Sequence, residues 1–304
     1  MALLGCGPEA KRDNPLDPVN GRGVWGIARN STASAVPGAV VTARPVNINT
    51  ICDAQGAYSL DLAGGERYVL TVSHPQYRDA SDTIDVPADG KLEKDFILVG
   101  KPYLSLAKVN TFKISRENGT FSRGLKLECR GTHLDGQYSL NAFNFYAALN
   151  GNNYPAAITP VPVDSFSRTY TWNLNLAVIY PEAPDSEALI IGRTVSFIIE
   201  PSEGLASLQA TVPQFEPVPT NLSPHNLATV TLPGSLSWFN AQASGVDITV
   251  EIWQGTQLQW SITTANVSSV ICPAILDPGN YTWLVRTTDI EGNTAAAEAT
   301  FTIP

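Results

Sequence analysis

Short apolar runs separated by turn residues recur along most of the chain and predict a protein built from β-strands. In the first hundred residues the apolar runs fall at 39–41, 58–62 and 68–72, and turn clusters such as Pro37-Gly38 and Gly64-Gly65 separate them. Each run is shorter than an ordinary helix, and runs of this length between turn residues are typical of strands. The pattern predicts a compact module of antiparallel strands.

Strict alternation of apolar and polar residues predicts further strands later in the chain. Every second residue is apolar in one such stretch, at Tyr170, Trp172, Leu174 and Leu176. Successive side chains of a strand point to opposite faces, so we expect these four to share one face. Two more strands are expected at 194–199 and 205–212. The alternation predicts a second β-sandwich, of Ig-like type, between residues 100 and 215.

The first module carries a series of motifs that is similar to a known family. In chain order they are Gly23-Val24, Pro37-Gly38-Ala39-Val40-Val41, Cys52-Asp53-Ala54-Gln55-Gly56-Ala57-Tyr58, Tyr68-Val69-Leu70-Thr71-Val72 and Pro75-Gln76-Tyr77. Over residues 21–99 the series resembles the carboxypeptidase regulatory-like domain. The resemblance implies a transthyretin-like β-sandwich that serves as an accessory module. The peptidase that gives the family its name has no counterpart in this chain, so none of its catalytic residues carries over.

The last ninety residues resemble a fibronectin type III domain. The motifs that carry the resemblance are Leu236-Ser237-Trp238, the alternating series at 246–252, and Leu276-Asp277-Pro278-Gly279-Asn280-Tyr281-Thr282-Trp283-Leu284-Val285-Arg286. The resemblance implies that Trp238 lies in the core and that the hydroxyl of Tyr281 bonds back to the preceding loop. Residues 289–293 fit a hairpin turn before the last strand.

These readings together predict an all-β protein. We expect three tandem antiparallel β-sandwich modules, at 21–99, 100–215 and 216–304, behind a short extended N-terminal tether at 1–20. Gly100 and Pro102 mark the first boundary between modules.

Composition narrows the possible functions. A net charge of −9 and a pI near 4.8 argue against electrostatic binding of nucleic acid or of anionic lipid headgroups. His74, His133 and His225 stand one per module, and no known catalytic motif is present. We therefore expect neither an enzyme nor a cofactor. The four cysteines lie far apart, and we expect Cys52, Cys129 and Cys272 to be small buried hydrophobic residues.

The N-terminal segment Leu3-Leu4-Gly5-Cys6 resembles a lipobox, the signal that directs lipid attachment to a bacterial cysteine. A basic and apolar signal segment would have to precede the printed sequence for this interpretation to hold. The polar, proline-containing stretch after Cys6 fits a tether, and Gly7 in place of aspartate favours the outer membrane. The alternative is an ordinary terminus that happens to contain these residues.

Aromatic residues and asparagines crowd together between residues 138 and 172, and two interpretations are open. The rings could stack on sugars while amides donate hydrogen bonds, or they could simply form the core of the sandwich. The best exposed candidates for ligand contact are Asn152, Asn153 and Tyr154, in a loop that begins with Asn150-Gly151. Trp253, just past the alternating run, is a further candidate, although it could instead shield the end of its sandwich.

Asp289, Glu291 and Asn293 have the first, third and fifth spacing of a calcium loop. Position six is Thr294 instead of glycine and position twelve is Thr300 instead of glutamate, so we favour a structural turn over a calcium site.

The sequence thus favours a non-catalytic lipoprotein of the bacterial cell envelope, attached to the outer membrane through Cys6. Its expected role is binding or scaffolding, with an unidentified envelope protein or glycan as partner. The alternative is a carbohydrate-binding accessory protein that serves polysaccharide-degrading enzymes. Exposed aromatic residues in the middle module would favour that alternative.

Overall fold

The computed structural model describes residues 23–88, 91–156, 160–200, 207–240, 245–272 and 276–304. Most regular structure within these ranges is β-strand, which confirms the all-β prediction. The described ranges also contain three short helices, η1 (Gln137–Ala142), α1 (Leu176–Ile179) and η2 (Glu187–Leu189). No helix in the described ranges has the length and apolar character needed to cross a bilayer. The predicted tether and Cys6 lie outside the described residues.

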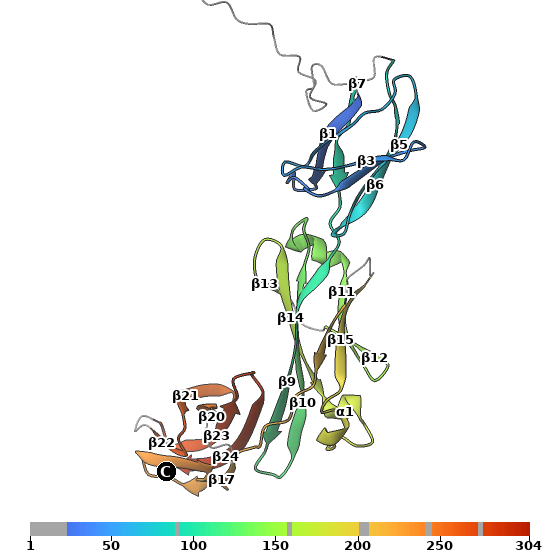
Figure 1. Ribbon diagram of the computed structural model, residues 1–304. Coiled ribbons are helices and arrows are strands. Elements are labelled where there is room, and N and C mark those ends of the chain that lie inside the picture. The colour runs from blue at the N-terminus through green and yellow to red at the C-terminus, as the bar shows by residue number, and fades with distance from the viewer. Residues whose placement is uncertain (1–22, 89–90, 157–159, 201–206, 241–244, 273–275) are drawn as a thin grey trace, which may run out of the picture.

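An N-terminal sandwich of two four-stranded sheets stands at one end of the molecule (Figure 1). One sheet has the order β3-β2-β5-β6, and its strands are β2 (Val40–Arg44), β3 (Ile48–Ile51), β5 (Arg67–His74) and β6 (Tyr77–Asp85). The other has the order β4-β1-β7 with β8 also on β1, from β1 (Gly23–Asn30), β4 (Ala57–Leu60), β7 (Lys91–Glu93) and β8 (Phe96–Leu98). Inward side chains such as Val41, Tyr58, Leu70 and Val72 form the core between them.

The Asp-x-x-Gly motif of this sandwich makes the turn between β3 and β4. Asp53 Oδ1 accepts hydrogen bonds from the backbone N–H of Gln55 (2.9 Å) and Ala57 (2.8 Å). Gly56 has a φ of +75°, and a Cβ there would lie 2.5 Å from the carbonyl oxygen of Ala28. Only glycine meets both conditions without strain, which explains why the motif requires it.

A second core lies in the middle of the molecule. One of its sheets has the order β12-β11-β15-β16, from β11 (Asn144–Leu149), β12 (Asn152–Pro155), β15 (Thr194–Glu200) and β16 (Ser207–Thr211). The facing strands are β9 (Tyr103–Ser115), β10 (Phe121–Thr132), β13 (Val161–Pro162) and β14 (Ser167–Asn175). All four residues predicted to share a face of β14 and its C-terminal end are buried, as expected: Tyr170, Trp172, Leu174 and Leu176. Fully burying a side chain such as Leu176 contributes about 2 kcal/mol to folding.

The third core lies between a three-stranded sheet and the C-terminal strands. The small sheet is β17-β19-β22, from β17 (Thr220–Ser223), β19 (Gly234–Phe239) and β22 (Ser269–Cys272). The larger contains β18 (Ala228–Thr229), β20 (Asp247–Gln254), β21 (Gln257–Ala265), β23 (Gly279–Thr288) and β24 (Thr294–Ile303). Trp238 is buried as predicted, with its ring centroid 6.4 Å from that of Trp283. The Tyr281 hydroxyl donates to the Asp277 carbonyl at 2.7 Å, which is the bond expected of that tyrosine.

The second and third cores share one sheet, which the sequence did not predict. Strand β24 pairs in parallel with the end of β9, from Thr294 opposite Phe112 to Ala297 opposite Ser115. The pairing joins the strands into one nine-stranded sheet with the order β13-β14-β10-β9-β24-β23-β20-β21 and with β18 on β24. The sequence predicted separate modules at 100–215 and 216–304. In the structure, backbone hydrogen bonds between β9 and β24 join these two parts.

The junction between the first and second cores is also built from specific contacts. Leu134 of the middle part packs against the N-terminal core. The carboxylate of Asp135 accepts a hydrogen bond from the backbone N–H of Gly100 at 2.7 Å, and the side chain of Asn30 donates to the carbonyl of Leu134 at 3.5 Å. Gly100 suits this position because an added Cβ would lie 3.1 Å from that of Leu134.

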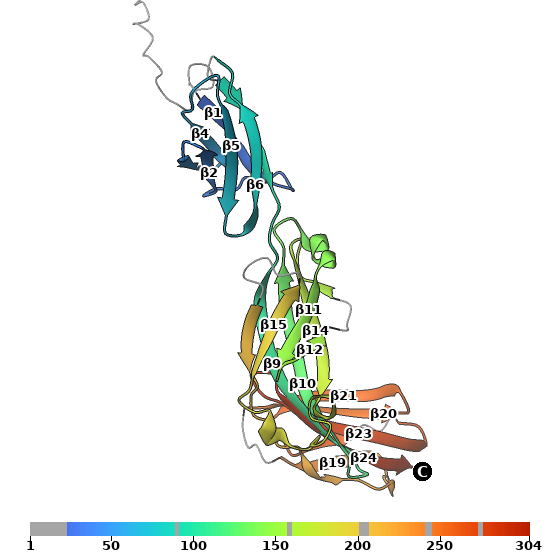
Figure 2. The same ribbon diagram turned by 90° about the vertical axis from the view of Figure 1, so that its right-hand side faces the viewer.

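The three sandwiches form an elongated molecule with a bent end. The N-terminal and middle sandwiches follow one another along one axis, and the C-terminal sandwich projects sideways from the far end of β9 and β10 (Figures 1 and 2). The N-terminal sandwich therefore lies at the opposite end of the molecule from the C-terminal one.

Candidate functional site

The histidines of the described chain do not assemble a catalytic or metal site. His133 is 3% exposed, its Nδ1 accepts a hydrogen bond from the backbone N–H of Asp135 at 3.1 Å, and burial lowers its pKa. His74 Nδ1 accepts from the backbone N–H of Gln76 at 3.2 Å, and burial likewise lowers its pKa. Both imidazoles serve local backbone turns. Among the described residues, no three His, Cys, Asp or Glu side chains gather closely enough to hold a metal.

The three described cysteines are buried in the cores, as the sequence indicated. Cys52, Cys129 and Cys272 are each at most 4% exposed. Burial raises the pKa of Cys52 and Cys272 to about 11 and that of Cys129 to about 12. A thiol with so high a pKa is a poor nucleophile at neutral pH.

The suspected calcium loop is a hydrogen-bonded turn between β23 and β24. Asp289 Oδ1 accepts from the backbone N–H of Glu291, Gly292 and Asn293 at 2.9, 2.7 and 2.8 Å, and its Oδ2 accepts from the Asn293 side chain at 2.8 Å. Asn293 Oδ1 in turn accepts from the backbone N–H of Thr111 on β9 at 2.9 Å. These groups stabilise the turn and attach it to the middle sandwich, which supports the structural interpretation.

The predicted contact residues lie on two different sheets. Asn152 and Asn153 are exposed on β12, but Tyr154 is half-buried against the middle core. Trp253 is half-buried on β20, opposite the exposed Leu258, and its indole N–H donates to Glu251 at 3.2 Å. The structure therefore does not bring Tyr154 and Trp253 into one site.

The exposed aromatic residues of the middle sandwich are not the ones that the sequence suggested. Two of them lie on neighbouring segments at the end near the N-terminal sandwich. Tyr138 is 76% exposed and Phe166 is 44% exposed. Hydrogen bonds from Gln137 N–H to the carbonyl of Ser165 (2.8 Å) and from His133 N–H to that of Phe166 (2.9 Å) hold their segments side by side. Arg168 completes what we call the aromatic patch: Tyr138, Phe166 and Arg168.

Arg168 fixes the geometry of the aromatic patch. Its guanidinium carbon lies 5.3 Å from the centre of the Tyr138 ring, within the range of a cation–π contact. The same guanidinium donates to the side-chain oxygens of Gln137 and Asn141, and the residue is only 8% exposed. One face of the Tyr138 ring thus lies against a buried cation, while most of the side chain stays exposed to solvent.

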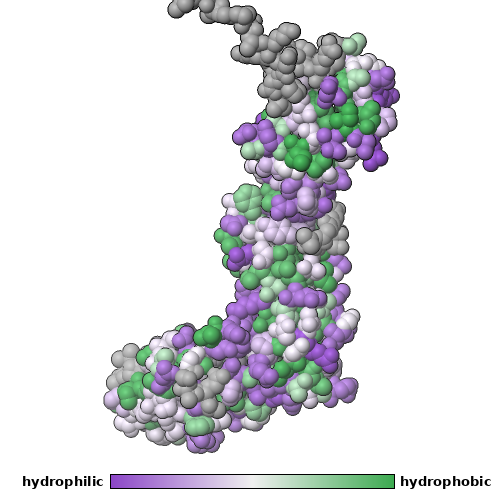
Figure 3. Space-filling model, viewed as in Figure 1, coloured by the Kyte–Doolittle hydropathy of each residue, from purple (hydrophilic) through white to green (hydrophobic). Residues whose placement is uncertain are grey.

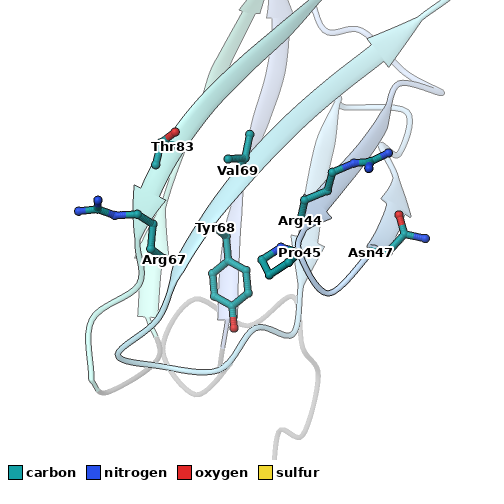
Figure 4. Close-up of a pocket in the computed structure, with 7 residues that line it drawn as sticks. All are labelled: Arg44, Pro45, Asn47, Arg67, Tyr68, Val69 and Thr83. Atoms are coloured by element: carbon teal, nitrogen blue, oxygen red, sulfur yellow. The ribbon is translucent and has the colours of Figure 1, made fainter.

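A shallow hollow of about 490 Å³ lies on the N-terminal sandwich (Figure 4). Pro45 and Val69 provide its apolar part, and the exposed side chains of Arg44 and Arg67 point away to either side. Arg67 is paired with Asp85 at 2.7 Å, but both side chains are about 70% exposed, so the pair stabilises little. This arrangement lacks convergent polar groups and carries no chemistry of its own.

Comparison with known proteins identifies the family of the first sandwich. Its residues 23–99 match the carboxypeptidase regulatory-like domain family. Residues 23–99 form a carboxypeptidase regulatory-like domain. Such domains are of a non-catalytic type, so nothing in this regulatory-like domain indicates an enzyme. No curated protein matches the sequence.

Two solved structures align with longer stretches of the chain. The TIE protein of Bacillus anthracis aligns over 93% of this chain, with 10% identity and a TM-score of 0.29, and this chain spans 48% of that protein's length. A DUF3823 family protein from Bacteroides ovatus aligns over 62% of this chain and 97% of its own, with 15% identity and a TM-score of 0.25. Scores this low carry no argument about architecture or function.

Sequence reasoning located the regulatory-like domain but missed which aromatic rings are exposed. Tyr138 and Phe166 belong to the aromatic residues between 138 and 172, for which the sequence left a sugar-binding role and a core role open. Most are indeed core residues, including Phe145, Tyr170 and Trp172. A local feature of the sequence could have indicated that these two rings are exposed. Tyr138 follows Gly136-Gln137, and Phe166 follows Asp164-Ser165. Both rings therefore lie in turn-forming segments and not in alternating strands.

Proposed function

We propose that this protein is a non-catalytic lipoprotein of the bacterial cell envelope that binds or scaffolds a partner. The observation that carries the proposal is the elongated arrangement of three sandwiches (Figure 1), in which the regulatory-like domain is the one that follows Cys6 most closely in the sequence. A lipid anchor at Cys6 would place the C-terminal sandwich farthest from the membrane along the chain. The motifs of residues 216–304 support a fibronectin type III-like module in that position, and alternation supports an Ig-like module in the middle.

The anchor can be tested in a diderm bacterium that expresses the chain behind a lipoprotein signal peptide. We expect wild type to fractionate with the outer membrane and to incorporate a clickable palmitate analogue, whereas Cys6→Ala remains soluble and unlabelled. A membrane-impermeant amine label on intact cells then distinguishes the surface from the periplasmic face. Soluble, unlabelled wild-type protein would contradict lipid anchoring.

The aromatic patch favours a second function, the binding of carbohydrate. An exposed tyrosine ring supported from one side by a guanidinium offers the flat apolar surface that stacks on a pyranose, and the amides of Gln137 and Asn141 lie beside it. Exposed aromatics in the middle sandwich are the feature that separates a carbohydrate-binding accessory protein from a simple scaffold.

Affinity electrophoresis of the purified chain in gels containing bacterial or plant polysaccharides tests this function. We expect at least one polysaccharide to retard wild type and Tyr138→Ala to weaken binding about three- to tenfold, the loss of one stacking contact. Phe121→Ala is the matched control, because Phe121 is likewise an exposed ring (44%) and lies 4.9 Å from the guanidinium of Arg123, but on a different surface. Equal effects of the two substitutions, or no retardation, would rule out the aromatic patch as a glycan site.

A further inference from the structure

Strand β3 of the regulatory-like domain forms an uncovered edge of its sheet. It pairs only with β2, and no other described strand bonds to its free side. Its sequence, Ile48-Asn49-Thr50-Ile51, contains neither charge nor proline. The opposite edge strand, β6, carries four charged residues: Arg78, Asp79, Asp82 and Asp85. Charges on an edge strand discourage pairing with another chain, so one edge of this sheet is protected and the other is not.

The register of β3 shows which backbone groups are available. The N–H of Cys52 donates to the carbonyl of Ala39 at 2.8 Å, so Cys52 directs its backbone groups toward β2. In an antiparallel pair this direction alternates from residue to residue. Ile48 and Thr50 therefore also bond to β2, while the N–H and C=O of Asn49 and Ile51 point to the free side. Two outward-facing residues two positions apart form the template to which another strand can bond.

An apolar groove runs beside this edge. A hollow of about 450 Å³ lies between β3 and β4, and Ile48, Ile51, Ala57 and Leu60 are among the residues that line it. Ile51 is 67% exposed and Ile48 is 41% exposed, which is unusual for large apolar side chains on so short a strand. A strand added at this edge would cover both isoleucines.

The charges at the groove determine what kind of strand fits. Asp53 follows β3, and its N–H donates to the carbonyl of Ala57 at 3.0 Å, which places it where β4 begins. Asp61 follows the end of β4, so the two carboxylates lie at opposite ends of the groove. A second copy of this chain would bring its own Asp53 and Asp61 and a net charge of −9. An extended segment with Lys or Arg on each side of its apolar residues is complementary instead.

We propose that the β3–β4 edge binds an extended, basic segment of a partner protein by strand addition. The partner's backbone bonds to Asn49 and Ile51, its apolar side chains cover Ile48 and Ile51, and its basic residues face Asp53 and Asp61. This interaction surface goes beyond the proposed envelope function and does not depend on lipid attachment, because it can be measured on the purified chain.

A phage library of random nine-residue peptides, selected on the immobilised full chain, provides the probe. Ile48 and Ile51 are three positions apart on β3 and therefore point to opposite faces of the sheet. We expect selected peptides to carry apolar residues on both faces of the added strand and Lys or Arg toward both ends. For the best peptide, synthesised and measured by fluorescence anisotropy, we expect Asn49→Pro to weaken binding at least tenfold. Proline removes the outward N–H of Asn49 but leaves the β2–β3 hydrogen bonds, which other residues make.

Asn49→Ala is the matched control, because it removes the same side chain and keeps the backbone N–H, and it should bind like wild type. Ile51→Lys provides a second test that leaves the backbone intact and should weaken a basic peptide by a similar factor. Circular dichroism melting checks that each variant is folded. The proposal is overturned if no peptide is selected, if binding is indifferent to both Asn49→Pro and Ile51→Lys, or if sedimentation shows that the chain self-associates through this edge instead.

Discussion

Burial removes the three described cysteines from ordinary thiol chemistry. With pKa values of about 11 to 12, only about one thiol in a thousand, or fewer, is ionised at pH 8. Their side chains are also closed off by the surrounding cores. These residues act as small apolar side chains, in keeping with the low sulfur reactivity that a packed interior imposes.

A thiol-labelling experiment measures this directly. In a Cys6→Ser variant, we expect Ellman's reagent at pH 8 to leave Cys52, Cys129 and Cys272 unmodified in the native protein. In guanidinium the same reagent should titrate three thiols per chain. Native labelling at the rate of a free peptide thiol would contradict the burial of at least one of them.

Glu216, between the second and third cores, is the buried carboxyl with the least favourable surroundings. It is 8% exposed, and its Oε2 has no hydrogen-bond partner among the described residues. Burial raises the pKa of Glu216, and the neighbouring Asp289 and Glu291 raise it further. The pKa of Asp289 moves the other way: burial opposes its ionisation, but the hydrogen bonds from Asn293, Gly292 and Glu291 together lower its pKa.

A raised pKa means that the folded protein favours neutral Glu216, so its contribution to stability is present at low pH and is lost as the pH rises through the folded pKa. Glu216→Gln keeps the shape of the neutral form. We expect it to stabilise the protein at pH 7 by on the order of 1 kcal/mol, with no gain near pH 4. Urea unfolding at both pH values measures the difference, and Glu66→Gln, at an exposed position of the N-terminal sandwich, serves as control. A stability change that is the same at both pH values would contradict the pH dependence.

At the scale of elements, the β23–β24 turn connects two sandwiches through one side chain. Asn293 is 2% exposed, and its Oδ1 also lies 3.3 Å from the Thr111 hydroxyl and 3.5 Å from the Asn110 amide. The turn that suggested calcium from its spacing is therefore a contact between β24 and β9. The same residues that resemble a metal loop in sequence are used for hydrogen bonding in the structure.

Asn293→Ala should destabilise the protein by about 1–3 kcal/mol, because it leaves the buried N–H of Thr111 without an acceptor. Ile290→Ala in the same turn is the control, since Ile290 is 94% exposed and should change stability little. Urea unfolding followed by tryptophan fluorescence gives both values. Added calcium should not restore Asn293→Ala, and restoration would instead indicate a bound ion at the turn.

For the whole molecule, the shared sheet predicts a fixed bend and not three freely moving modules. Beyond the β9–β24 pairing, the end of the β9–β10 hairpin holds the C-terminal sandwich. The carboxylate of Glu117 accepts from the Thr300 hydroxyl at 2.6 Å and from the backbone N–H of Asn226, and Arg116 lies 3.8 Å from Glu298. These contacts add to the parallel strand pairing, so we expect the two sandwiches to move as one body.

Cleavage by a glutamate-specific protease reports on this connection, because Glu216 lies in the segment that joins the two sandwiches. We expect wild type to resist cutting at Glu216, and the double variant Glu117→Ala, Asn293→Ala to be cut there several-fold faster. Cutting at the exposed Glu66 should proceed at the same rate in both proteins and serves as the internal standard. Rapid cutting of wild type at Glu216 would show that the two sandwiches separate freely.

Much of the fold was predictable from local patterns in the sequence. The strands at 170–176 and 246–252 were expected from their alternation, because strand faces depend on neighbours in sequence. The burial of Trp238 and the bond of Tyr281 were expected from the resemblance to fibronectin type III domains. The candidate site was less predictable. Exposure of Tyr138 depends on the packing of η1 against the start of β14, and the partner of Asn293 lies 182 residues away.

The sequence by itself determined the all-β class and the inward faces of the main strands, because the two-residue period of a strand can be read from adjacent residues. Its motifs also identified the regulatory-like domain. Only the tertiary structure decided that β24 joins β9, that β3 is left uncovered beside a groove, and that the segments of Tyr138 and Phe166 lie next to each other. Each of these features depends on which distant segments meet. Strand pairing between distant segments depends on the packing of the whole chain, so no local pattern in the sequence predicts it.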